Sequence, residues 1–208
     1  MIIKTEFQPN INGYPFPNRF EKNWLNIFIR VTIGNSIYGL CGGMVFSALD
    51  YYYNKVDLPL INSEDTERYT QFVHYLWRRQ LNSMPLKNYY DLLTRNFSKD
   101  NNLLIGTISR QLPKVTQSID AGIPCPLVII RSSKFENLTN NHQLVITGYE
   151  IDNSVTNLFC YDPNHPGETP SIMISRDINA LSIKQSTFEA IRGFFCNHYK
   201  IKPPFSAD

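Results

Sequence analysis

The sequence has 208 residues, 42% hydrophobic content and a formal net charge of +2. A chain of this length can bury a hydrophobic core without disulfides or metals, and its many aromatic residues exclude an intrinsically disordered composition. The near-neutral charge argues against the basic face of a nucleic-acid-binding protein. We therefore expect one folded domain over residues 1–208 that does not bind nucleic acid.

No apolar segment of signal-peptide length opens the chain, and no apolar run approaches the roughly 20 residues that span a bilayer. We therefore expect a soluble protein without membrane partners, either cytoplasmic or exported without a cleaved signal peptide. None of the four cysteines lies within four positions of another, which excludes zinc-ribbon spacing; they are Cys41, Cys125, Cys160 and Cys196. Since a chain this long does not need disulfides, we expect reduced thiols.

The N-terminal region, residues 1–20, is rich in Asn, Pro and Phe and is predicted to form an extended arm, with Phe16 and Phe20 as anchors. Residues 24–33 are β-branched and aromatic, which predicts a strand or an extended lead-in. The run ends at residues 34–36, a Gly-Asn-Ser sequence typical of a turn.

The next feature is Cys41, which lies among glycines at 39, 42 and 43 and directly before a run with helical spacing, predicted to end near residues 53–54. A cysteine at a helix start feels the positive end of the helix dipole, which favours its nucleophilic thiolate. The glycines would keep the space around the sulfur open to a substrate. The alternative is a buried structural thiol behind a glycine turn.

Three more helices are predicted in the first half, over residues 64–81, 87–97 and 107–121. We expect Ser63 to start the first of them. Pro113 in the third suggests a start later than residue 107. The predicted inward residues are Tyr69, Phe72, Val73, Leu76 and Leu81 in the first helix and Tyr90, Leu93 and Phe97 in the second.

The second half, residues 122–208, has the pattern of strands. Strands are predicted at 127–130, 142–150, 155–161, 171–175 and 193–201, with a hairpin about residues 152–154. Residues 127–130 form a continuous apolar run, as in a strand buried on both faces. The mainly helical half, residues 21–121, followed by an antiparallel sheet predicts an α+β fold.

A cysteine nucleophile needs a base, and His142 is the candidate because it opens the clearest strand of the chain. Asp162, at the far end of the hairpin partner, would lie beside it and could orient its ring; Asn164 could do the same. The alternative makes Asp162 a turn former before Pro163. For the oxyanion, we consider the Cys41 amide and the Asn35 side chain, although Asn35 could also be only a turn residue.

This order of residues resembles the papain-like cysteine peptidase superfamily. The bacterial peptidases that cleave double-glycine leader peptides are the closer analogue, and a bacterial group of uncharacterised papain-like proteins is more similar still. The resemblance rests on residues 39–44, 141–144, 161–164 and 192–195, which read Gly-Leu-Cys-Gly-Gly-Met, Asn-His-Gln-Leu, Tyr-Asp-Pro-Asn and Arg-Gly-Phe-Phe. Where the family has Gln six positions before the cysteine, this chain has Asn35.

The resemblance implies a papain-like fold, with the cysteine on a central helix packed against the sheet. It also implies a cysteine hydrolase that cuts peptide or amide bonds in a protein or peptide substrate through Cys41, His142 and Asp162, without metal or organic cofactor. An acyltransferase or deamidase could use the same residues. A binding module of the same fold without turnover is the third possibility. The sequence predicts neither the substrate preference nor the oligomeric state.

Overall fold

The computed structural model describes the chain except residues 21–38, 62–63, 132–139, 178–179 and 207–208. The predicted strand at 24–33, the oxyanion candidate Asn35 and the predicted helix start at Ser63 lie outside the described residues.

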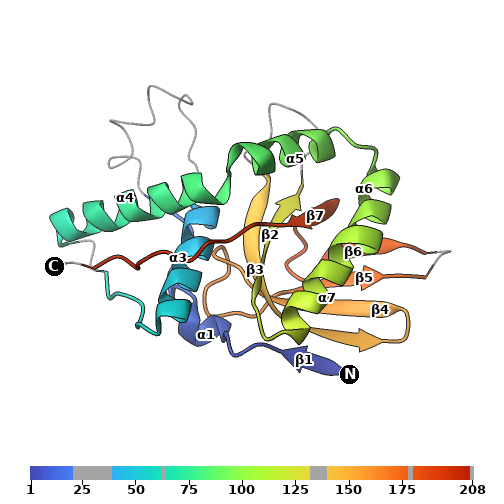
Figure 1. Cartoon of the computed structure of the whole chain (residues 1–208), viewed down its shortest axis with the longest axis horizontal. Helices are drawn as coiled ribbons and strands as arrows, with labels where there is room; N and C mark the ends of the chain where they lie inside the picture. Colours follow the sequence, from blue (N-terminus) through green and yellow to red (C-terminus); the bar gives the residue numbers. More distant parts are fainter. Residues whose placement is uncertain (21–38, 62–63, 132–139, 178–179, 207–208) are drawn as a thin grey trace.

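The described chain is an α+β structure, as predicted, in which a helical part and an antiparallel sheet lie side by side (Figure 1). The helices are α1 (Pro9–Asn12), α3 (Cys41–Asn54), α4 (Thr66–Ser83), α5 (Leu86–Asn96), α6 (Asp100–Gly106) and α7 (Leu112–Asp120), with a π-helical segment, η1 (Thr107–Gln111), between the last two. The strands are β1 (Ile2–Lys4), β2 (Cys125–Ile130), β3 (His142–Asp152), β4 (Val155–Tyr161), β5 (Ser171–Ser175), β6 (Ser182–Gln185) and β7 (Gly193–Cys196).

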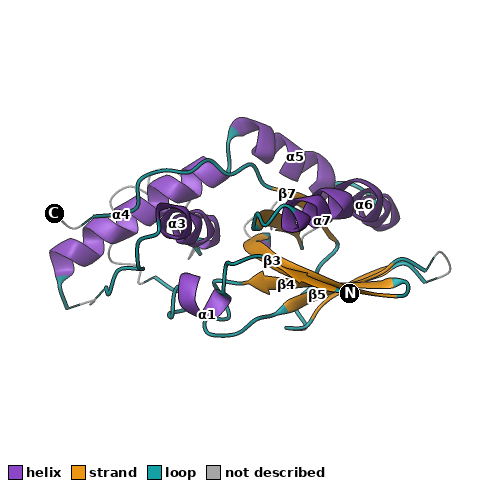
Figure 2. Ribbon diagram, turned by 60° about the horizontal axis from the view of Figure 1, so that its bottom comes forward, coloured by secondary structure: helices purple, strands orange, loops and turns teal. Residues whose placement is uncertain are grey.

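Strand β3 is the centre of the sheet, whose order is β6-β5-β4-β3-β2-β7 with antiparallel pairs throughout. One edge of β3 pairs with β4, while its other edge pairs first with β2 and then with β1. Helices α5, α6 and α7 lie along one side of the sheet (Figure 2). The chain contains no described helix that is long and apolar enough to cross a membrane.

Three hydrophobic clusters fill the interior of the described structure, and β3 contributes to the two larger ones. Val145 packs with α3, α4 and the N-terminal segment. Its neighbours Leu144 and Ile146 pack with α7 and the other strands instead. This follows from the two-residue period of a strand, which sends successive side chains to opposite faces. Strand β3 therefore links the two halves of the molecule.

The N-terminal segment is not the plain extended arm that was predicted. It forms β1 and α1, because the edge of β3 beyond β2 offers unpaired backbone groups that β1 completes. The predicted anchoring is confirmed, since Phe16 and Phe20 pack in the cluster that covers α3 and α4.

The predicted helices exist, but the predictions of which side chains of α4 and α5 face inward were partly wrong. Helix α4 begins at Thr66 with Asp65 as its cap, and it buries Phe72, Val73 and Leu76 as expected, whereas Leu81 is exposed. In α5, Tyr90 and Phe97 are exposed, and the buried face is formed by Asn88, Leu92 and Asn96. Apolar periodicity missed this face because two of its three residues are asparagines.

The α-helix that contains Pro113 is α7, which begins at Leu112, later than residue 107, with Pro113 in its first turn as predicted. The helical path also continues upstream of α7, through η1 and α6, to Asp100, which was not predicted. A proline donates no backbone hydrogen bond, and the wider π-helical turn before it accommodates that loss.

In the sheet, β6 was not predicted, and β7 ends at Cys196 rather than continuing to Ile201.

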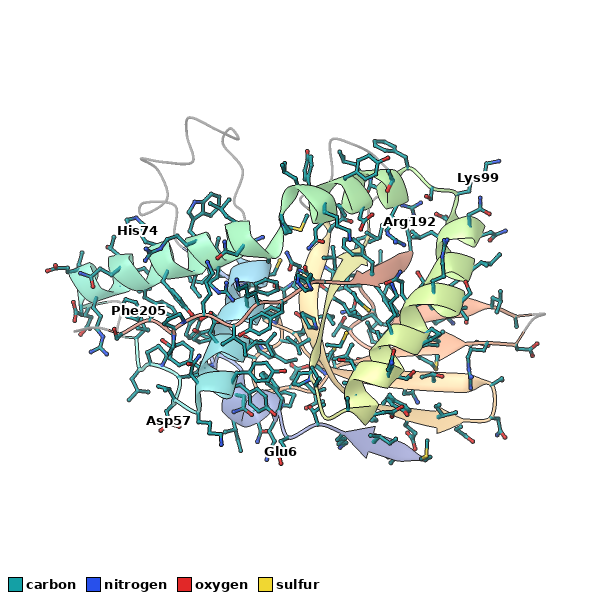
Figure 3. The ribbon with its side chains drawn as sticks, in the orientation of Figure 1. Glu6, Asp57, His74, Lys99, Arg192 and Phe205 are labelled. Carbon is teal, nitrogen blue, oxygen red and sulfur yellow. The ribbon has the colours of Figure 1, made fainter. Side chains whose placement is uncertain are left out.

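After β7 the chain crosses back to the helical part instead of extending the sheet. The Tyr199 hydroxyl donates to Asp50 of α3 at 2.7 Å, and the Phe205 carbonyl accepts from the Tyr51 hydroxyl at 2.9 Å. Figure 3 shows Phe205 beside α4. The C-terminal segment thus ties α3 and α4 to the sheet. All four cysteines are free thiols, as predicted.

Candidate active site

Cys41 is the first residue of α3, at the helix start that the sequence predicted. Every residue of α3 from Cys41 to Tyr51 is buried, so the helix is enclosed by the fold and holds its first turn rigidly. In that turn, the Gly43 amide donates to the Gln80 side chain at 2.9 Å, which satisfies one of the free N–H groups of the helix start.

The glycines around Cys41 are packed closely, which corrects the expectation that they keep space open. A Cβ on Gly43 would collide with the backbone carbonyl of Leu76 in α4. On Gly42 it would collide with the side chains of Ser83 and Gln143. The missing side chains therefore let the start of α3 approach α4 and β3 directly.

His142 and Asp162 are brought together by the β3–β4 hairpin. His142 is the first residue of β3, and Asp162 directly follows β4, whose Tyr161 pairs with Val145. The His142 Nε2 and Asp162 Oδ1 atoms are 2.6 Å apart, and both side chains are buried. The Asp162 Oδ1 atom also accepts a hydrogen bond from the backbone amide of Asn164 at 2.8 Å, so two contacts hold the carboxylate in place.

Cys41 lies close enough to His142 for the histidine side chain to lower the pKa of the thiol, and the backbone amides of Gly42 and Gln143 act in the same direction. Because Asp162 contacts Nε2 of His142, Nδ1 is the ring nitrogen that remains for the sulfur. The three residues come together from the start of α3, the start of β3 and the end of β4.

The electrostatics of these three residues favour a charged thiol and a charged imidazole. Burial alone would raise the pKa of Cys41, but the hydrogen bond and positive charge of His142, with the two backbone amides, lower it. Burial alone would lower the pKa of His142, but the charge and hydrogen bond of Asp162 and the contact with Cys41 raise it to about 10. His142 in turn holds the pKa of Asp162 low despite burial.

Asn164, the second candidate for orienting His142, is used elsewhere. Its side-chain oxygen accepts from Asn18 Nδ2 at 3.3 Å. The side-chain oxygen of Asn18 also accepts a hydrogen bond from the backbone amide of Leu40 at 2.6 Å. The backbone amide of Asn18 donates to the Pro163 carbonyl at 2.9 Å. Asn18 was not predicted as a site residue, because no local pattern connects it to residues more than 20 and 140 positions away.

A second group that the sequence did not reveal lies behind Cys41. It is a network of buried amides and one hydroxyl, in which Gln143 donates to Ser83 Oγ at 2.9 Å and accepts from Asn197 at 2.8 Å. Asn88 donates to Asn197, which links α5 to the same network. A buried network with every member satisfied fixes one arrangement of its elements. Here it fixes the end of α4, α5 and the start of β3 relative to the segment after β7.

One group of side chains near the site has the composition of a metal site. Ligand atoms of Asp162, His165 and Glu189 lie within 4.8 Å of one another. However, Asp162 is committed to His142, and Glu189 pairs with Arg131 at 2.9 Å. Ion pairing within the described residues accounts for this group, and we assign no metal to it.

A cysteine on a central helix, packed against an antiparallel sheet that carries a histidine, is the architecture of the papain-like cysteine peptidases. The chain belongs to the Peptidase_C39-like family, whose family model matches residues 43–190. The match begins two residues after Cys41 and includes both His142 and Asp162. Searches of curated proteins and of solved structures returned no match.

Proposed function

We propose that this protein is a cysteine hydrolase that cleaves peptide or amide bonds, with Cys41 as nucleophile, His142 as acid and base, and Asp162 as the residue that orients His142. The observation that carries the proposal is the arrangement of these residues: His142 Nε2 lies 2.6 Å from Asp162 Oδ1, and the proximity of His142 lowers the pKa of Cys41. Covalent cysteine catalysis requires an activated thiol, a base and an orienting group, and the three side chains are suited to these roles.

In the proposed reaction, the Cys41 sulfur attacks the substrate carbonyl and forms a tetrahedral intermediate. The intermediate collapses to a thioester as His142 donates its proton to the leaving amine. His142 then removes a proton from water, which attacks the thioester, releases the acid product and restores the thiol. Asp162 stays ionised and stabilises the imidazolium that the cycle requires.

The oxyanion of the intermediate needs hydrogen-bond donors. The Cys41 backbone amide is suited to this role, because it is one of the free N–H groups of a helix start and has no hydrogen-bond partner in the described part of the chain. We propose the side-chain amide of Asn35 as the second donor, at the position where papain-like enzymes carry Gln.

The experiment is a cleavage assay on a complex peptide mixture, read by mass spectrometry, for the wild type and for Cys41→Ser. We expect the wild type to cut a subset of peptides and Cys41→Ser to cut none. Cys160→Ser is the matched control: Cys160 is fully buried with its pKa raised by burial, and this variant should cut like the wild type. Double-glycine peptides belong in the mixture because the sequence resembles leader peptidases.

Two results would overturn the hydrolase assignment. Cleavage that persists in Cys41→Ser would exclude Cys41 as the nucleophile. Wild-type protein that cuts nothing, and whose Cys41 reacts with iodoacetamide like a free thiol, would indicate a binding module. Products that carry an added amine, rather than a free carboxylate, would assign an acyltransferase that uses the same three residues.

A further inference from the structure

A basic cavity lies among the helices between α5 and α7. It has a volume of about 380 Å³ and is formed by residues of α5, α6, η1 and α7, none of which belongs to the Cys41 site. Arg95, Arg110 and Lys114 line it, and no acidic side chain is among its described lining residues. A cavity of this size can enclose a small molecule.

Arg95 of this cavity differs from the other arginines of the described chain that are not exposed. Of the described arginines that are not fully exposed, three form ion pairs with carboxylates: Arg79 with Asp50, Arg131 with Glu189 and Arg192 with Asp100. Arg95 is the fourth, and it forms no ion pair within the described residues. Arg110 and Lys114 have no described carboxylate partner either. Three positive charges thus meet at one cavity without compensation.

Arg95 also has an unmet hydrogen-bonding requirement. Its guanidinium stacks over the ring of Phe195 at 5.3 Å, and its Nε atom is shielded from solvent without a hydrogen-bond partner in the described structure. An unsatisfied buried donor is costly, and native structures rarely keep one without a reason. A ligand with several acceptor oxygens would satisfy it.

The other two cations, Arg110 and Lys114, line the same cavity. The Arg110 guanidinium lies over Gly106, where a Cβ would come within 2.8 Å of its terminal nitrogen. Both Lys114 and Arg95 also lie near Cys196. The interaction with Cys125 lowers the pKa of Cys196 and burial raises it, and the positive charges of Lys114 and Arg95 lower it further.

We propose that this cavity binds the phosphate group of a small phosphorylated molecule, at a site separate from Cys41. Two guanidinium groups offer paired donors that match phosphate oxygens, and Lys114 adds a third charge. The side-chain amide of Asn102, which also lines the cavity, provides a neutral donor. The proposal does not depend on the hydrolase activity.

Calorimetric titration with orthophosphate, pyrophosphate and adenosine 5′-monophosphate tests this site at low ionic strength, with sodium chloride at equal ionic strength as the blank. We expect saturable binding to the wild type, and about tenfold weaker binding for each of Arg110→Gln and Lys114→Gln, the loss of one charge-assisted contact. Both residues are exposed, so these variants should fold.

Lys99→Gln is the matched control. Lys99 lies at the outer corner between α5 and α6 (Figure 3) and is exposed, but it does not line the cavity. It should bind like the wild type. Tighter binding of adenosine monophosphate than of orthophosphate would identify an organic phosphate as the ligand, and equal binding would identify the inorganic ion. No saturable binding, or equal weakening by Lys99→Gln and Arg110→Gln, would overturn the proposal.

Discussion

The side-chain oxygen of Asn18 accepts a hydrogen bond of 2.6 Å from the backbone amide of Leu40, the residue directly before Cys41. The backbone amide of Asn18 donates to the carbonyl of Pro163, the residue directly after Asp162. One residue of the N-terminal segment therefore connects the backbone on the nucleophile side of the site with the backbone on the carboxylate side. We infer that Asn18 positions both.

Replacing Asn18 tests this positioning role. Asn18→Ala removes the side-chain acceptor and leaves the backbone amide of Leu40 without this partner. We therefore expect the rate of peptide cleavage to fall by about 10- to 100-fold, mainly in kcat. Asn18→Asp keeps the acceptor and should retain more activity than Asn18→Ala. Steady-state kinetics on a cleaved peptide measure both effects. Equal, wild-type kcat values for the two variants would contradict the role.

The pH dependence of Cys41 labelling tests its contact with His142. The pKa of Cys41 is lowered and that of His142 is raised, so thiolate and imidazolium coexist between the two values. We expect iodoacetamide labelling to stay fast below the ordinary thiol pKa of about 8.5 and to fall only as the pH drops through the lowered pKa of Cys41.

His142→Ala should move the midpoint of this profile upward, toward the free-thiol value, because the main group that favours the thiolate is gone. His74→Ala, on the exposed face of α4, is the matched control and should leave the profile unchanged. Labelling is followed at Cys41 by peptide mass spectrometry. A profile that is the same in His142→Ala and the wild type would show that the two side chains are not coupled.

Asp162→Asn removes the negative charge beside His142 while keeping a similar shape. The pKa of His142 should fall, because Asp162 is the main group that raises it. Peptide cleavage should drop by about 10²- to 10⁴-fold, as expected when a catalytic base loses its correct protonation state. NMR titration of the His142 ring and kinetics measure the two changes.

Asn164→Ala serves as the comparison, since the Asn164 side chain contacts Asn18 and not His142. It should leave the titration of His142 close to that of the wild type. If Asn164→Ala lowered the pKa of His142 as strongly as Asp162→Asn, the assignment of the orienting role to Asp162 would be wrong.

The close contact between α3 and α4 predicts a stability effect at Gly43. A Cβ there meets the Leu76 backbone, which cannot move aside without shifting α4, so Gly43→Ala should lower the free energy of unfolding by about 1–3 kcal/mol. In Gly106→Ala the new methyl meets only the movable end of Arg110, and better helix propensity should make that variant neutral or more stable. Urea denaturation measures the free energy of unfolding of both variants. Equal free energies of unfolding for Gly43→Ala and Gly106→Ala would refute the packing argument.

The sequence by itself determined most of the secondary structure and the order of the candidate residues, because both depend on local spacing. Helical periodicity located α3 and α4, and alternation and turn residues located the β3–β4 hairpin. The hairpin geometry alone predicted that His142 and Asp162 lie together, and the structure brings them within 2.6 Å.

Only the tertiary structure decided which surfaces meet, because contacts between distant segments leave no periodic pattern in the chain. It placed Asn18 between Leu40 and Pro163, and it turned the asparagine face of α5 inward onto a polar network that apolar spacing could not reveal. It also changed the role of the glycines beside Cys41 from spacers to close contacts with α4 and β3. A missing side chain has the same appearance in a sequence whether the fold leaves the space empty or fills it.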